Sequence, residues 1–220
     1  MLYTAQQVKD NIRNKEGKRV FYLGKADQLT SEAKDYLTRE RIEIPPGQMA
    51  KKDRYRLLSG GYIEEKPEHM THLNAEYLVE KTHPRIVFRG AVDLLEGELL
   101  LAMGELPGWQ RELTEVLELA RKLISCDVLE QPVPESKLGG LDEAQLRNRS
   151  HFPQEFYGQP HFMPQSGDKR EVLLLNRLRS LVRQTELKAV AAFPNRPDII
   201  RAINRMSSFL YILMLREKGT

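Results

Sequence analysis

The chain has 220 residues, 40% of them hydrophobic and 30% charged, which fits a globular protein with one large domain or one domain and a small appendage. Its 34 basic and 31 acidic residues give a net charge of +3, too even a balance to favour a nucleic-acid partner. No apolar run approaches the ~20 residues of a membrane span and no signal-peptide core follows Met1, so we expect a cytoplasmic protein without a membrane partner. The single cysteine, Cys126, excludes an internal disulfide and a zinc site built from several thiolates.

Residues 1–48 are expected to form a small α/β element. Residues 4–14 have the spacing of a short amphipathic helix, and Thr30 or Ser31 can cap a second helix. The apolar runs 19–23 and 42–44 are expected to be short strands that pair side by side. Residues 49–66 are polar and contain Gly60-Gly61, so we interpret them as a connector.

Residues 67–220 are expected to form a helical bundle. Periodic apolar positions predict long helices at 84–103, 109–127 and 169–192 and from Ile199 onwards, with a shorter helix at 141–147. Residues 151–168 are rich in aromatics and prolines and are expected to be a loop. Four long helices joined by moderate loops describe a bundle, so the predicted fold class is mainly α.

Three polar residues, Arg179, Arg183 and Glu186, interrupt the apolar run of the helix at 169–192. Their spacings of four and three place them on one stripe of that helix. A buried charge is costly unless it meets a partner or a charged ligand. The pattern therefore predicts a helix that borders both the core and an anion-binding pocket.

A second polar stripe, Arg89, Asp93 and Glu96, has the same spacing in the helix at 84–103. If the two stripes face each other, Asp93 can accept a bidentate hydrogen bond from Arg179. The alternative is two solvated faces whose surface ion pairs contribute about 0–1 kcal/mol each, and the pattern alone favours it.

Other polar residues leave alternatives open. Asn204 and Ser208 share one side of the last helix, and an inward Asn204 needs hydrogen-bond partners that a ribose, a phosphate or a neighbouring helix can supply. His69 and His72 are spaced for metal ligation, but no third ligand matches them, so no metal site is predicted. The common glycine-rich phosphate loops are absent from the sequence, so an enzyme built on this chain must grip its substrate with helix-borne side chains.

These motifs resemble those of ATP:cob(I)alamin adenosyltransferases. The stretch from Val79 to Asp93 is similar to that family's lysine-to-glycine-to-aspartate motif. The helix with Arg179, Arg183 and Glu186 is similar to its arginine-arginine-glutamate helix, and residues 204–208 are similar to its asparagine-arginine motif. The ethanolamine-utilisation branch is the most similar, through Lys66-Pro67, Thr71-His72-Leu73, Ser150-His151-Phe152-Pro153 and residues 175–179. Two departures are the absence of a metal-binding cysteine cluster before Lys66, and Ser208 where the wider family often has aspartate.

The resemblance implies transfer of the 5′-deoxyadenosyl group of ATP to cob(I)alamin, in support of ethanolamine utilisation. Its implied substrates are ATP and cobalamin, with Mg²⁺ as an accompanying ion and no protein metal site. Arg183 is expected on the triphosphate, Glu186 on the nucleotide or Mg²⁺, and Arg179 in a pair with Asp93. The other implied binding residues are Lys81 and Asn204 for the nucleotide, Arg89 as a further cofactor-binding residue, and His161 and Phe162, in the aromatic loop, for the corrin.

A homo-oligomer is implied by analogy, together with reductase or microcompartment partners and a location in the cytoplasm or inside a bacterial microcompartment. The competing interpretation is a non-catalytic helical protein that holds a corrinoid or a partner in a metabolic assembly. Turnover of ATP with reduced cobalamin distinguishes the two, because a binding protein forms no cobalt–carbon bond.

Overall fold

The structure is a computed structural model that describes residues 2–15, 17–24, 27–45 and 55–219. The chain divides into two compact units, residues 1–55 with 62–65 and residues 56–61 with 66–220, and each is considered by itself. Part of the connector predicted at 49–66 lies outside the described residues, because these resume at Tyr55.

The first unit is a small α/β element whose helices begin at capping residues. Thr4 and Gln7 bond reciprocally at the start of the first helix, and Thr30 accepts a hydrogen bond from the Ala33 amide at the start of the second. The elements of this unit are β1 (Leu2–Tyr3), α1 (Ala5–Asp10), β2 (Arg13–Lys15), β3 (Lys18–Val20), β4 (Gln28–Leu29), α2 (Ser31–Arg39) and β6 (Tyr62–Ile63).

Two predictions for this unit needed adjustment. Helix α1 ends at Asp10 rather than near residue 14, because residues 13–15 pair with β3 as an antiparallel hairpin. The predicted strand at 42–44 forms only a single parallel bridge, between Glu43 and Val20. The two apolar runs nevertheless meet side by side, as expected, and enclose a small core with α1 and α2 that contains Val8, Phe21, Ala33, Leu37 and Ile42.

The second unit begins with a small sheet that the sequence did not predict. Strand β8 (Tyr77–Glu80) pairs in parallel with Arg56 and Leu57 of β5 (Tyr55–Leu57) and antiparallel with β7 (Met70–His72). The strands are three or four residues long, too short for apolar alternation to mark them. An Asx turn at Asn74, whose side chain accepts from the Glu76 and Tyr77 amides, joins β7 to β8.

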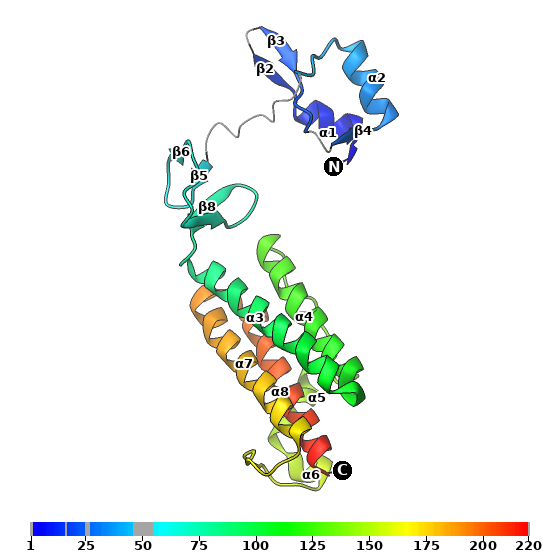
Figure 1. The fold of residues 1–220 in the computed structure, drawn as a ribbon, viewed down its shortest axis with the longest axis vertical. Helices are drawn as coiled ribbons and strands as arrows, with labels where there is room; N and C mark the ends of the chain where they lie inside the picture. The colour runs from blue at the N-terminus through cyan, green and yellow to red at the C-terminus, as the bar shows by residue number, and fades with distance from the viewer. Residues whose placement is uncertain (1, 16, 25–26, 46–54, 220) are drawn as a thin grey trace. The chain divides into compact units, whose positions relative to one another are not determined.

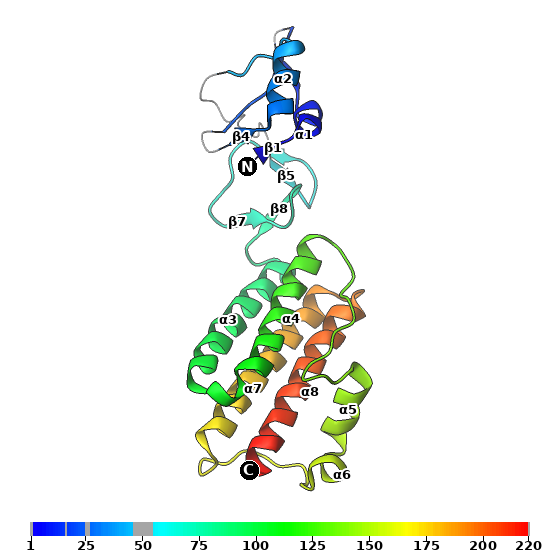
Figure 2. The ribbon, with the colours of Figure 1, turned by 90° about the vertical axis from the view of Figure 1, so that its right-hand side faces the viewer.

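The rest of the second unit is a helical bundle, which confirms the predicted fold class. Its four long helices lie side by side, and two short ones pack next to the last of them (Figure 1 and Figure 2). The helices are α3 (Pro84–Glu105), α4 (Gln110–Val128), α5 (Glu143–His151), α6 (Pro153–Tyr157), α7 (Arg170–Ala192) and α8 (Pro197–Gly219), with a 3₁₀ turn at Pro107–Trp109. Helix α6 lies inside the region expected to be a loop; it begins at Pro153 and ends at Tyr157, and Gly158, whose φ is 65°, caps its C-terminus.

Helix α8 is the centre of the bundle. All residues from Phe209 to Leu215 are buried, so this stretch has no solvent-exposed side. Polar atoms on such a helix must find partners inside the protein. No helix among the described residues is long and apolar enough to cross a membrane.

Candidate active site

A row of polar side chains lies along the seam between α7 and α8. Asn204 Nδ2 donates to Glu186 Oε1 over 2.9 Å, and Arg205 donates to the other amide atom of Asn204, Oδ1. Seven residues further along α8, Tyr211 packs its ring against the Arg179 guanidinium, 5.2 Å from carbon to ring centroid. Glu186 contacts Asn204 and Arg179 contacts Tyr211, so the two helices are antiparallel. The predicted residues Arg179, Glu186 and Asn204 therefore lie along the same seam.

Two guanidinium groups on this seam are close together and have no carboxylate partner in the part of the chain that the structure describes. Arg179 is half-buried, and its Nε is buried without a hydrogen-bond partner among the described residues. Burial lowers the pKa of Arg179, and the positive charge of Arg183 lowers it further. Within the described residues neither group forms an ion pair, and Arg183 itself is exposed. A polyanion bound here would relieve this repulsion and satisfy the buried donor.

The polar stripe of α3 faces α4 rather than α7. Arg89 donates to Asp127 of α4, and Glu96 accepts from Arg121 of α4 over 2.8 Å. Helix α3 instead meets α7 on another face, where Arg177 pairs with Glu98 at 2.8 Å and Arg170 pairs with Glu105.

The predicted Arg179–Asp93 pair is therefore wrong for a single chain. Asp93 is exposed on α3, and the described residues contain no ion pair between it and Arg179. The Arg179 guanidinium lies against Tyr211 instead. The four-and-three spacing places each set of residues along one side of its helix, but the packing of α3 on α4 turns the α3 stripe away from α7.

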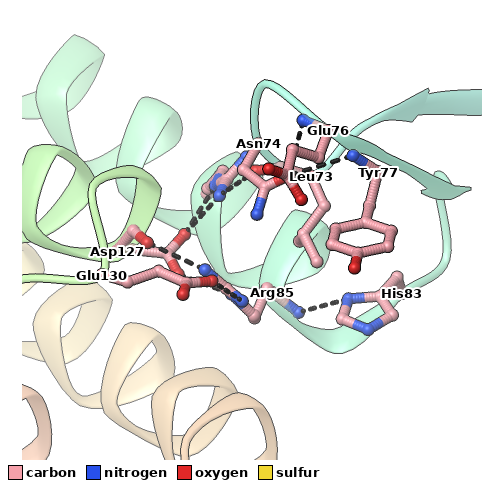
Figure 3. A network of polar contacts seen from close by, with 9 residues as sticks. Leu73, Asn74, Glu76, Tyr77, His83, Arg85, Asp127 and Glu130 are labelled. Carbon is pink, nitrogen blue, oxygen red and sulfur yellow. Dashed lines mark hydrogen bonds and ion pairs between the residues drawn. The ribbon is translucent and has the colours of Figure 1, made fainter. Parts of the chain in front are cut away.

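Arg89 belongs to a buried network at the start of α3 that also contains Arg85 and Asp127. Figure 3 shows Arg85 and Asp127 facing each other in this network. The Asp127 carboxylate, 0% exposed, accepts from Arg85 Nε and from Arg89 Nε, each over 2.6 Å. Arg89 Nη2 also donates to the carbonyl of Leu73, in the turn between β7 and β8, over 2.8 Å. His83 accepts from the Arg85 amide, and burial lowers the pKa of His83. The network ties α3, α4 and the β7–β8 turn together.

Lys81, a predicted nucleotide contact, also lies at this end of the unit. Its side chain is exposed and its amide donates to the His69 carbonyl over 2.8 Å. The sequence did not predict that Arg85 and Asp127 form a network with Arg89. The available signals were the four-residue spacing of Arg85 and Arg89 and a lone acid ending the apolar side of the helix at 109–127.

The aromatic loop reaches the α7–α8 seam through Tyr211. The Phe162 amide donates to Tyr211 Oη over 3.2 Å, and His161 Nδ1 lies 3.2 Å from the same oxygen. The structure thus brings the predicted residues His161 and Phe162 to the helix that carries Asn204. Tyr211 itself was missed, although it lies seven residues after Asn204, on the same side of α8, within an apolar run.

No group of three or more histidine, cysteine, aspartate or glutamate side chains in the described part of the chain is arranged to hold a metal ion. His69 and His72, whose spacing would suit a metal ion, lie just before and at the end of β7, and His72 is exposed. The seam does offer one carboxylate, Glu186, beside the two arginines, and Mg²⁺ commonly binds through one or two carboxylates together with substrate phosphates.

Comparison with known proteins identifies the family. Residues 61–217 match the family model described as cobalamin adenosyltransferase. The chain belongs to this family. The chain is also 33% identical over 160 residues to the corrinoid adenosyltransferases EutT of Salmonella typhimurium strain LT2 and Escherichia coli strain K12, a match that covers 70% of the chain and 60% of each relative.

The cobalamin adenosyltransferase match covers β7, β8 and the bundle, and with them every predicted site residue. Most of the first unit lies outside it, because the matched region begins at Gly61. The chain spans 60% of the length of these curated relatives.

Proposed function

We propose that this protein transfers the 5′-deoxyadenosyl group of ATP to cob(I)alamin, forming adenosylcobalamin and releasing triphosphate in support of ethanolamine utilisation. The observation that carries the proposal is the adjacent pair Arg179 and Arg183, two guanidinium groups on one seam without a carboxylate partner in the described chain. The family membership and the names of the EutT relatives support the same reaction.

The chemistry needs little covalent participation by the protein. Co(I) of the substrate is a strong nucleophile that attacks C5′ of ATP; the cobalt–carbon bond forms as the C5′–O bond breaks, and the triphosphate leaves with the electron pair. The protein has to align C5′ with cobalt and stabilise the charge of the leaving polyphosphate. Helix-borne arginines suit the second task because their planar donors match phosphate oxygens.

Each seam residue has a role in this proposal. Arg183 is exposed and free to bind the triphosphate, while Arg179, held against Tyr211, contributes a fixed positive charge. Glu186, whose Oε1 is held by Asn204, orients the nucleotide or Mg²⁺ on its phosphates. Lys81 is proposed as a further nucleotide contact. Arg89 is not proposed as a nucleotide contact, because it donates to Asp127 and to the Leu73 carbonyl.

The aromatic loop is proposed to cover the corrin. Phe152, Phe156 and Met163 expose 52%, 40% and 79% of their surface, so this end of the unit presents apolar area that a corrin face can bury. Cover of this kind excludes water and the lower axial ligand, which would make Co(II) easier to reduce to Co(I). A reductase, a homo-oligomeric assembly, and a location in the cytoplasm or a microcompartment fit the same proposal.

The test is Arg183→Ala, assayed with ATP and chemically reduced cobalamin. We expect loss of at least about a hundredfold in adenosylcobalamin formation with unchanged helicity, because the leaving group loses a charged donor. Lys188→Ala is the matched control: it removes an exposed positive charge from α7 outside the stripe, and should leave turnover near wild type.

Two results would go against the proposal. Undiminished turnover in Arg183→Ala would remove the assigned role of the arginine stripe. A wild-type protein that binds cobalamin but forms no cobalt–carbon bond would identify a non-catalytic corrinoid-binding protein instead.

A further inference from the structure

We propose that Tyr211 is a positioning residue that builds the phosphate-binding seam and the corrin-covering loop as one unit. The inference rests on the proposed function, which places the triphosphate at the arginine stripe and the corrin at the aromatic loop. Tyr211 acts through its neighbours: its ring fixes Arg179 and its hydroxyl fixes the loop.

Tyr211 is set in the rigid centre of the bundle. Its side chain is 8% exposed, and it lies in the stretch of α8 that is buried on every side. A tyrosine in such a place costs free energy unless its hydroxyl is bonded. Both of its hydroxyl contacts go to the loop after α6, at His161 and Phe162.

The hydroxyl contacts form a consistent chain of donors. The Phe162 amide has a proton to give, so Tyr211 Oη accepts from it over 3.2 Å. The Tyr211 proton then points to His161 Nδ1, also at 3.2 Å, and His161 Nε2–H donates to the His151 carbonyl over 3.0 Å. This assignment fixes the tautomer of His161 with its proton on Nε2. The hydroxyl therefore contacts both His161 and Phe162, the two residues that we place over the corrin.

The ring contacts connect this chain to the arginine stripe. The rings of His161 and Phe162 stack near Tyr211 at centroid distances of 5.8 and 5.9 Å, with interplanar angles of 14° and 26°. The Arg179 guanidinium packs on the same ring at 5.2 Å. Because Arg179 Nε has no hydrogen-bond partner in the described chain, the cation–π contact is what orients this guanidinium.

The two halves of the contact can be separated by mutation. Tyr211→Phe keeps the ring and removes the hydroxyl, so the Phe162 amide and His161 lose their partner while Arg179 keeps its support. Tyr211→Leu removes both supports. A merely structural tyrosine would affect both substrates alike, whereas the proposed arrangement predicts different effects on the corrinoid and on ATP.

Steady-state kinetics of the full chain with ATP and chemically reduced cobalamin give the first test. For Tyr211→Phe we expect the KM for the corrinoid to rise about tenfold, because the hydrogen bonds to the Phe162 amide and to His161 are both lost, with the KM for ATP within about twofold of wild type. Tyr211→Leu should in addition lower kcat. Tyr77→Phe removes a hydroxyl in the sheet and should leave both KM values unchanged.

A second measurement does not depend on turnover. Amide hydrogen exchange at Phe162 should be at least about tenfold faster in Tyr211→Phe than in wild type, at equal thermal stability, because the amide loses its acceptor. Unchanged exchange at Phe162, or equal rises in the KM values of ATP and the corrinoid, would overturn the inference. A wild-type protein without adenosyltransferase activity would defeat the proposed function alone, and the exchange result would still decide whether Tyr211 holds the loop.

Discussion

Individual charged side chains in this protein differ sharply in how well they are satisfied. Arg179 has no carboxylate partner in the described chain, whereas the carboxylate of Asp198, in the first turn of α8, accepts from Arg196 at 2.8 and 2.9 Å and from the Val133 amide at 2.9 Å. The Arg196 guanidinium holds the pKa of Asp198 far below its ordinary value. A fully bonded charge contributes stability, while an unpaired one costs stability and marks a binding site.

Asp198→Asn tests whether the hydrogen-bonded carboxylate of Asp198 stabilises the fold. We expect a loss of about 1–3 kcal/mol in the free energy of unfolding at pH 7, because two charge-assisted hydrogen bonds are weakened. A lowered folded-state pKa gives stability that is fully present above the ordinary value of 3.8 and is lost as the pH falls below it. Urea unfolding of both proteins should therefore give a smaller difference at pH 3 than at pH 7. An equal difference at both values would exclude this electrostatic origin, and Glu135→Gln, an exposed carboxylate, serves as the control.

At the scale of secondary-structure elements, Asp127 holds three segments that are far apart in sequence. Its carboxylate accepts from two arginines of α3 whose side chains are 19% and 16% exposed, and one of them also holds the β7–β8 turn. The network decides which side of α3 faces α4. At the start of α3, the His83 side chain accepts from the amide of Arg85, one of these two arginines (Figure 3).

Asp127→Ala should destabilise the second unit by about 3–5 kcal/mol, because it leaves two largely buried guanidinium groups without their shared anion. Chemical denaturation against Glu118→Ala, an exposed acid on α4, measures this loss. Arg89→Ala combined with Asp127→Ala should cost less than the sum of the single losses. Strict additivity would show that the two side chains do not act as one network.

At the scale of the whole molecule, the residues that the structure describes form two hydrophobic cores. The larger one joins the helices of the bundle and the smaller one lies within the first unit, around Phe21. Units with cores of their own are able to unfold independently.

Phe21→Ala tests this independence. The substitution empties a fully buried site in the small core and should destabilise the first unit by about 3–5 kcal/mol. Hydrogen exchange should show lost protection in α1 and α2, with protection of α7 and α8 as in wild type. The reciprocal control is Leu113→Ala, in the core of the bundle, and a loss of protection in both units from either variant would contradict independent unfolding.

The sequence by itself determined the features that depend on neighbouring residues. Apolar periodicity located the four long helices, and capping residues placed the start of α2 at Thr30 or Ser31, of which the structure uses Thr30. Spacing alone placed Arg179, Arg183 and Glu186 on one stripe, because helix geometry repeats locally. Which stripes face each other was decided only by tertiary structure. The Arg89–Asp127 bond joins residues 38 apart in sequence, and that contact turns the α3 stripe to α4, against the expected pair of Asp93 and Arg179. Tyr211 gained its role in the same way, since its partners lie about 50 residues away and no local period records them.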